Sequence, residues 1–251
     1  MTGTTIPWLD RTIENLVEIA TEKSGYLIQN LLKYLTKYAT EHEAILNRDP
    51  DIMTRLREIQ TNSYESLTQT KPKVADTITE LSREVKPIEM TGNHIALFGL
   101  TSTGKSTMLN SLLGENVAET GYSETTTKLT PYERIGFVIW DVPGANDEVS
   151  YMSMQYISFL KGLQRRLIII KHTVKENSSL MKLMGDIKLH YAIVVNHYDM
   201  VSEEEKPKLH KQIDKEINEL GLKRVDHVFF VSARYPGRYD WRKMVKYLVK
   251  S

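Results

Sequence analysis

The residues with the clearest chemical meaning form the octapeptide GLTSTGKS at positions 99–106, directly after the apolar run Ile95–Phe98. This pattern, G-x-x-x-x-G-K-S, is typical of phosphate-binding loops. A strand that leads through a glycine-rich turn into a helix points backbone N–H groups and the positive end of the helix dipole at one place, which suits phosphate. We expect Lys105 to reach the β and γ phosphates of a nucleoside triphosphate and Ser106 to ligate Mg²⁺. The residues expected to contact the nucleotide here are Gly99, Thr101, Ser102, Thr103, Gly104, Lys105, Ser106 and Thr107.

A second signal is the tetrapeptide DVPG at 141–144, which follows the strand-like run Phe137–Trp140. A carboxylate at the carboxyl end of a strand beside the phosphate loop can hold Mg²⁺ through water, and a following glycine lets a backbone N–H approach the γ phosphate. The same letters also occur in ordinary turns. Their position relative to the loop favours Asp141 as a metal residue and Gly144 as a catalytic one.

The third signal is the tetrapeptide NHYD at 196–199, which follows the apolar run Tyr191–Val195 and resembles the N-K-x-D box of GTPases. A carboxylate at Asp199 only accepts hydrogen bonds, so it can take two N–H bonds from the guanine edge that adenine does not offer. We therefore expect Asn196, His197 and Asp199 to bind a guanine nucleotide. His197 replaces the usual lysine, and its ring can stack on the base instead.

Two further segments complete the expected site. Ser232 and Ala233 follow the apolar run Val228–Val231 and can present a backbone N–H to the guanine carbonyl. Between the phosphate loop and Asp141, the segment 118–132 contains the threonines Thr125–Thr127. One threonine hydroxyl there can complete the Mg²⁺ shell when the triphosphate is bound, as in a first switch. The chemistry does not choose among the three, and a polar surface loop is the alternative.

The pattern A-x-T-G-x-x-E-x-T-x-x-x-x-P-Y from Ala118, followed by W-D-V-P-G, resembles the interferon-inducible immunity-related GTPases, relatives of the dynamin superfamily. The resemblance covers about residues 99–144. It implies that Thr126 is the switch threonine, which ligates the metal and supports catalysis. It also implies GTPase activity, a G domain beside a helical domain built from both chain ends, and pairing of two G domains. The chain departs from this family by stopping after the helix expected at Trp241–Val249.

The spacing of apolar residues predicts the elements that position these motifs. From about residue 93, short β-rich runs alternate with helices, which predicts βαβ units and a mainly parallel sheet. The expected strands are Ile95–Phe98, Phe137–Asp141, Leu167–Lys171, Ala192–Asn196 and Val228–Val231. Ser202 to Glu205 form a capping box that predicts a helix start, and Gly221 predicts its end.

Residues before about Val85 carry helical spacing almost throughout, with one helix expected after Asp49-Pro50 and another from Pro72 to Val85. We therefore expect an N-terminal helical segment of about three helices at 1–90 and a three-layer α/β G domain at 91–251. The apolar stripes of these helices are expected to pack on one another.

Composition limits the other options. With 33 Lys and Arg against 32 Asp and Glu, the formal charge is +1, which gives no electrostatic case for nucleic-acid binding. The basic run Gln164–Arg166 is expected to be a solvated strand flank. The chain has no cysteine, no signal segment and no apolar run of about 18 residues, so a cytoplasmic location is expected, with membrane contact only through a surface or a partner.

The combined interpretation is a Mg²⁺-dependent GTPase that hydrolyses GTP to GDP and phosphate, switches with its nucleotide and pairs through its G domain. Ala145 stands where small signalling GTPases carry a water-orienting glutamine, so slow basal turnover is expected. Two alternatives remain open: a nucleotide-gated binding module with negligible hydrolysis, and an adenine-nucleotide protein. Asp199 argues against the latter.

Overall fold

The structure, a computed structural model, describes residues 63–249 apart from 71, 116–129, 135, 143–151 and 153. The described residues belong to one compact unit that spans Thr61–Ser251. The helices predicted before residue 63, including the one expected after Asp49-Pro50, lie outside the described residues. The division of the chain at residue 90 stays a prediction.

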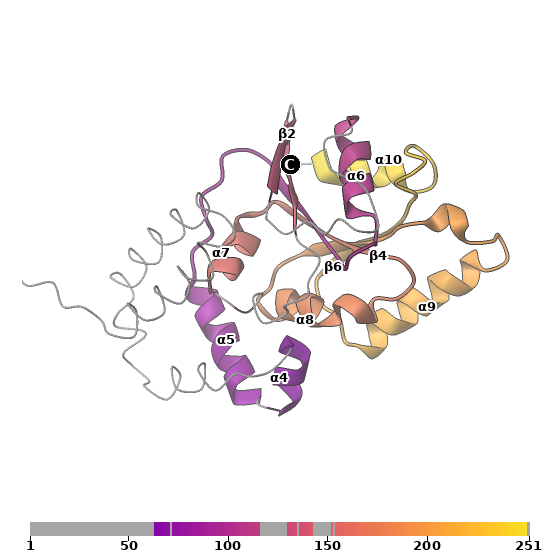
Figure 1. Cartoon of the computed structure of the whole chain (residues 1–251). Coiled ribbons are helices and arrows are strands. Elements are labelled where there is room, and N and C mark those ends of the chain that lie inside the picture. The colour runs from indigo at the N-terminus through magenta and orange to yellow at the C-terminus, as the bar shows by residue number, and fades with distance from the viewer. Residues whose placement is uncertain are drawn as a thin grey trace, which may run out of the picture. The chain divides into compact units, whose positions relative to one another are not determined.

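A six-stranded sheet with the strand order β2-β3-β1-β4-β5-β6 organises this unit (Figure 1). The strands are β1 His94–Phe98, β2 Thr130–Arg134, β3 Phe137–Asp141, β4 Arg165–Ile170, β5 Tyr191–Val195 and β6 Val225–Phe230. Neighbouring strands run parallel, except that β2 is antiparallel to β3. Every residue of β1 and β5 is buried, as expected for strands covered on both faces. The predicted mainly parallel sheet is confirmed.

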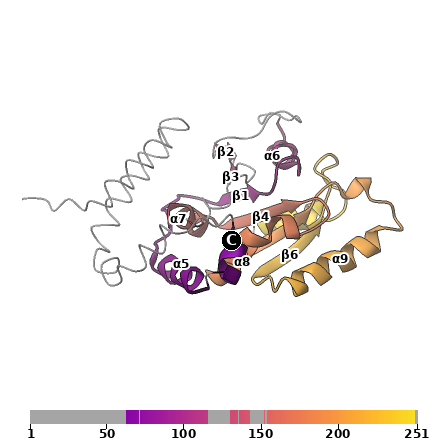
Figure 2. The same ribbon diagram turned by 60° about the horizontal axis from the view of Figure 1, so that its bottom comes forward.

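Helices cover both faces of the sheet (Figures 1 and 2). One face carries α6 (Lys105–Leu113) and α10 (Trp241–Val249), and the other carries α7 (Met154–Gly162), α8 (Ser178–Asp186) and α9 (Lys206–Glu219). Met108 of α6 and Met244 of α10 belong to the same buried core cluster as Leu97 of β1. The neighbouring residue Phe98, whose side chain alternates to the other face, is also buried. These three layers confirm the predicted α/β G-domain fold.

The strand order places a ligand site at the carboxyl ends of β1 and β3. From β1 the chain passes through α6 to β2 and β3 on one side, and then returns through α7 to β4 on the other side of β1. In open α/β sheets, ligands bind in the crevice outside the strand ends where the order reverses in this way. The phosphate loop follows β1, and Asp141 ends β3.

Two elements differ from the sequence prediction. Strand β2 was not among the predicted strands; its first residues belong to the segment 118–132, for which a switch or a polar surface loop was expected. It pairs with β3 from Thr130 opposite Asp141 to Arg134 opposite Phe137. Pro131 is compatible with β2 because an edge strand leaves one side of its backbone unpaired. Helix α9 begins at Lys206, not at Ser202, because Pro207 occupies its first turn, where the missing N–H costs nothing.

Two helices precede the sheet, α4 (Tyr64–Thr70) and α5 (Pro72–Glu84). The predicted helix start at Pro72 is confirmed, and Ile78 and Leu81 of α5 are buried. Helix α4 is attached to α8, because the backbone N–H of Tyr64 donates to Ser179 Oγ at 2.8 Å and Glu65 forms an ion pair with Lys182. None of the described helices has the length and apolarity needed to cross a membrane.

Arg166 corrects the prediction of a solvated strand flank. Its side chain is buried in β4, and its guanidinium donates to three backbone carbonyls: Leu160, Leu163 at 2.7 Å and His190 at 3.2 Å. Burial lowers the pKa of Arg166 to about 10, so it remains charged at neutral pH. The run contains no apolar residue that would mark the position as buried. The guanidinium instead supplies the hydrogen bonds that the carbonyls need.

Candidate nucleotide-binding site

The phosphate loop lies between the end of β1 at Phe98 and the start of α6 at Lys105. Gly99 has φ +143° and Gly104 has φ +87°, conformations that favour glycine. A Cβ on Gly99 would lie 2.3 Å from the carbonyl oxygen of Ile169, and a Cβ on Gly104 would lie 2.4 Å from Asn196 Nδ2. Both glycines therefore allow the loop to approach β4 and the segment after β5.

Lys105 is buried and directed back at the loop that precedes it. Its Nζ donates to the carbonyl oxygen of Gly99 at 2.8 Å and to that of Leu100 at 3.0 Å. Burial lowers the pKa of Lys105, while the nearby negative charge of Asp141 raises it. An ammonium group has three N–H donors, so two carbonyl bonds leave one for a phosphate oxygen. The site thus holds a cation beside the N-terminus of α6.

Asp141 supplies the negative charge on the other side of Lys105. It is the last residue of β3, it is only 1% exposed, and it lies in register with Leu97 of β1. Its partner on β2 is Thr130, the residue at which the chain returns from segment 116–129. A buried carboxylate and the hydroxyl of Ser106 are the oxygen ligands that Mg²⁺ prefers, so these residues fit the expected metal.

Asn196 joins the phosphate loop to the segment after β6. Its Nδ2 donates to the carbonyl oxygen of Thr103 at 2.9 Å, and its Oδ1 accepts from the backbone N–H of Ala233 at 2.9 Å. The Asn196 residue is 2% exposed. Ser111 of α6 reinforces this connection by donating to the carbonyl oxygen of Ala233 at 2.6 Å. One side chain therefore fixes the distance between the two loops.

His197 lies against the phosphate loop. Its φ is +59°, and a Cβ added to Gly104 would lie 3.3 Å from His197 Nε2. Nε2 is buried and makes no hydrogen bond within the described part of the chain. Burial lowers the pKa of His197, and the positive charge of Lys171 lowers it further, so the imidazole is neutral at neutral pH. Asp199 follows in the short 3₁₀ turn Tyr198–Met200 and is partly exposed.

Tyr198 anchors this turn, although the sequence interpretation gave it no role. Its backbone N–H donates to the carbonyl oxygen of Val231 at 3.1 Å, and its hydroxyl lies 2.9 Å from His210 Nε2. Its ring meets that of Tyr239 edge-on, with centroids 5.0 Å apart, and the Lys206 ammonium lies 5.0 Å from the Tyr198 ring centroid. In the sequence, the only feature that could have indicated this role is an aromatic residue between the polar residues His197 and Asp199.

The family model for interferon-inducible GTPases matches residues 57–251, which is well over half of the chain. This chain belongs to the interferon-inducible GTPase family. The assignment confirms the resemblance inferred from the switch region, and it extends the match through all the strands that carry the site.

Individual relatives show lower similarity. T-cell-specific guanine nucleotide triphosphate-binding protein 2 from Mus musculus is 31% identical over 155 residues, which cover 57% of this chain and 37% of that protein. GTPase Era from Ehrlichia ruminantium (strain Gardel) is 26% identical over 170 residues, covering 62% of this chain and 54% of that protein. The chain therefore spans from about a third to a half of the length of these relatives. A crystal structure of an Aquifex aeolicus Era variant bound to GDP.AlF4- has 20% identity and a TM-score of 0.49, covering 64% of this chain and 56% of that one.

The structure brings most of the sequence-predicted residues of this interferon-inducible GTPase to one edge of the sheet. The phosphate loop, Asp141, Asn196 and His197 are linked by the contacts above. The sequence predicts that Ser232 and Ala233 present a backbone N–H to guanine. In the structure the N–H of Ala233 donates to Asn196, and the hydroxyl oxygen of Ser232 accepts from the backbone N–H of Tyr235 at 3.2 Å. Thr126 and Gly144 lie outside the described residues.

Proposed function

We propose that the chain binds GTP with Mg²⁺ and hydrolyses it to GDP and phosphate. The observation that carries the proposal is the bridge through Asn196, which holds the phosphate loop and the segment expected to face the base at a fixed separation. Lys105 and Asp141 lie at the loop end of the same arrangement. Membership of the interferon-inducible GTPase family supports the reaction.

The proposed chemistry uses the groups around Lys105. Water attacks the γ phosphorus, the new P–O bond replaces the bond to the β–γ bridging oxygen, and the proton of the water passes to the released phosphate. Lys105 and the backbone N–H groups at the start of α6 stabilise the charge that develops on the phosphoryl oxygens. Mg²⁺, held by Ser106, Asp141 and Thr126, would supply further neutralisation of phosphate charge. Gly144 is proposed to direct a backbone N–H at the γ phosphate.

Guanine selectivity is proposed to reside in Asp199 and His197. The Asp199 carboxylate accepts two N–H bonds from the base, and the neutral His197 ring packs against the face of the base. A neutral ring suits this position because an uncharged imidazole loses less hydration than an ammonium when it is covered. The absence of cysteine agrees with a cytoplasmic location, which we include in the proposal.

Nucleotide affinity and turnover test the proposal together. Calorimetry with GTP, GDP and ATP should show a strong guanine preference in the unmodified chain. Lys105→Ala should abolish triphosphate binding, whereas Lys208→Ala, at an exposed position on α9, should leave it unchanged. Asp199→Asn should reduce the preference for GTP over ATP, because the amide offers one acceptor where two are needed. GTP affinity of Lys105→Ala within a few-fold of the parent would refute the phosphate-loop assignment.

Nucleotide-dependent switching and G-domain pairing are the finer part of the proposal. Ala145 cannot orient the attacking water, so we propose that two G domains face each other and complete each other's sites. GTP hydrolysis per protomer should then rise with protein concentration, and a GTP analogue should favour the dimer over GDP in light scattering. Constant specific activity over about a hundredfold concentration range, with a monomer in every nucleotide state, would contradict the pairing.

A further inference from the structure

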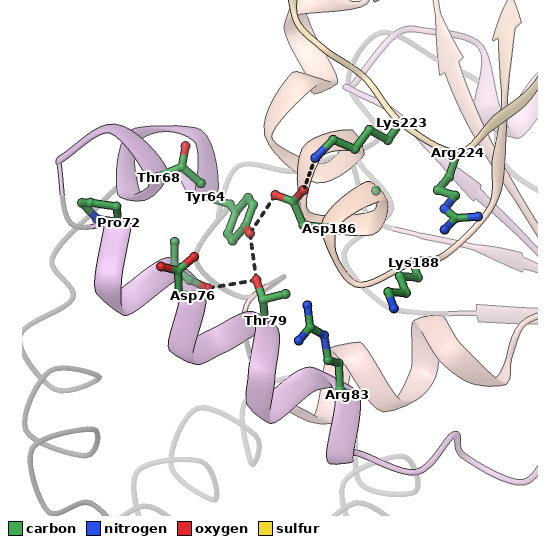
Figure 3. A pocket seen from close by; sticks show the side chains of 12 residues that line it. Tyr64, Thr68, Pro72, Asp76, Thr79, Arg83, Asp186, Lys188, Lys223 and Arg224 are labelled. Atoms are coloured by element: carbon green, nitrogen blue, oxygen red, sulfur yellow. Dashed lines mark hydrogen bonds and ion pairs between the residues drawn. The ribbon is translucent and has the colours of Figure 1, made fainter.

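A cavity of about 430 Å³ lies between α5, the residues after α8 and the residues before β6 (Figure 3). Its volume is within the range of about 300–1,000 Å³ that is usual for small-molecule sites. Lys223 and Arg224 line it just before β6 begins, so it lies at the amino-terminal end of that strand. The phosphate loop follows the carboxyl end of a parallel strand, and the two sites are therefore at opposite edges of the sheet.

Cationic side chains from three segments line this cavity, which we call the basic pocket. They are Arg83 on α5, Lys188 after α8, and Lys223 and Arg224 before β6. Figure 3 shows Arg83 on one side and Lys188 and Arg224 on the other. Because these segments are far apart in sequence, the grouping is a product of the fold.

The carboxylates of the basic pocket do not balance these cations. Asp186 accepts a hydrogen bond from the Tyr64 hydroxyl at 3.1 Å and pairs with Lys223 at 3.2 Å. Burial raises the pKa of Tyr64 to about 12, so this hydroxyl keeps its proton and remains a donor to Asp186. Asp76 on α5 is the other lining carboxylate, and it is exposed, as are Arg83, Lys188 and Arg224.

The remaining cations are available for a ligand. Within the described residues, neither the guanidinium of Arg83 nor the ammonium of Lys188 forms an ion pair. Arg224 Nη1 lies 3.4 Å from His190 Nε2, and the other ring nitrogen of His190, Nδ1, lies 2.6 Å from a carboxylate oxygen of Asp226. Arg83, Lys188 and Arg224 therefore present three cations to one cavity, and none of them forms an ion pair with a carboxylate within the part of the chain that the structure describes.

The backbone at two of these cations is unusual. Lys188 has φ +64° and Arg224 has φ +65°, in the left-handed region that side-chain-bearing residues seldom adopt. At Lys188 this conformation ends helix α8: the backbone N–H of Leu189 donates to the carbonyl oxygen of Met184 at 2.8 Å, as in a left-handed helix C-cap. Here both conformations occur where the chain carries a cation at the rim of the same cavity.

We propose that the basic pocket binds a small soluble anion with two or more phosphate groups. A guanidinium makes paired hydrogen bonds to phosphate, and an ammonium acts as a point charge, so Arg83, Arg224 and Lys188 are suited to phosphate groups. Three cations on separate segments match a ligand with several charged groups better than one phosphate. Such a ligand would contact α5, the residues that follow α8 and the residues that precede β6.

Calorimetry on GDP-loaded protein tests the proposal, because GDP occupies the nucleotide site. The probes are inorganic phosphate, pyrophosphate and tripolyphosphate, at fixed ionic strength and fixed free Mg²⁺. We expect one saturable site whose affinity increases with the number of phosphate groups. The double variant Arg83→Gln/Lys188→Gln should bind tripolyphosphate at least about tenfold more weakly, because two charge-assisted contacts are lost.

The matched control is Lys208→Gln/Lys211→Gln, which removes two exposed cations from α9 outside the basic pocket. It should change tripolyphosphate affinity by less than about twofold. GDP affinity, measured in both double variants, should remain that of the parent, which separates this site from the nucleotide site. Equal weakening in the two double variants, or no saturable binding to the GDP-loaded parent, would overturn the proposal.

Discussion

Replacing Asn196 by alanine should destabilise the protein and uncouple the two loops of the nucleotide site. The substitution removes two hydrogen bonds of 2.9 Å, to the carbonyl of Thr103 and from the N–H of Ala233. Thr103 and Ala233 are each 2% exposed, so the backbone groups left behind have little access to water. Because each lost bond leaves a buried backbone group without a partner, each costs about 1–3 kcal/mol. With partial relaxation, we expect the free energy of unfolding to fall by about 2–5 kcal/mol.

Urea denaturation of the nucleotide-free protein measures this loss. The control is Asn218→Ala, since Asn218 Nδ2 also donates to a backbone carbonyl, that of Asp214 at 2.9 Å, but on the exposed side of α9. It should change the free energy of unfolding by no more than about 0.5 kcal/mol. GDP affinity should also fall in Asn196→Ala and not in the control. A loss below about 1 kcal/mol in Asn196→Ala would show that the bridge contributes little to stability.

Two further predictions concern residues that contact this bridge. Gly104→Ala should weaken nucleotide binding by more than about tenfold in calorimetry, because its Cβ would displace Asn196. Gly136→Ala, with a similar φ of +95° but open space around it, controls for backbone strain and should bind normally. Burial and the Lys171 charge hold the pKa of His197 below 6.5, so the folded state binds this proton less readily than the unfolded chain. Stability should therefore fall as the pH drops below about 6.5, and more steeply in the parent than in His197→Gln, as measured by thermal unfolding. Identical pH profiles would contradict this assignment.

Local chemistry made much of the fold and of the site predictable. The phosphate loop needs glycines, a lysine and a hydroxyl residue at fixed spacing, and it follows the apolar run Ile95–Phe98 of strand β1. Asp141 and Asn196 could likewise be predicted to lie at strand ends, because each follows a run of apolar residues. Parallel strands then bring their carboxyl ends to one edge, so the motifs converge without any further information.

The remaining features depend on contacts between distant parts of the chain. Arg166 is a surface residue by type, and only the three carbonyls around it make its burial favourable. Strand β2 contains Pro131, which in isolation indicates a loop, and its pairing with β3 makes it a strand. The role of Ala233 was also beyond the sequence, because its N–H could face either the base or Asn196 until the two loops were placed together.

The geometry around Lys105 shows how the fold directs its ammonium group. Two of the three ammonium protons are held by the carbonyls of Gly99 and Leu100, which fixes the direction of the third. The loop carbonyls and the negative charge of Asp141 offset the cost of burying this cation. Asn196 in turn fixes the loop, because its Nδ2 donates to the carbonyl oxygen of Thr103. The same Nδ2 lies so close to Gly104 that a side chain at that position would collide with it. The contacts of Lys105 and Asn196 thus hold the described part of the phosphate loop against the ends of β3 and β5.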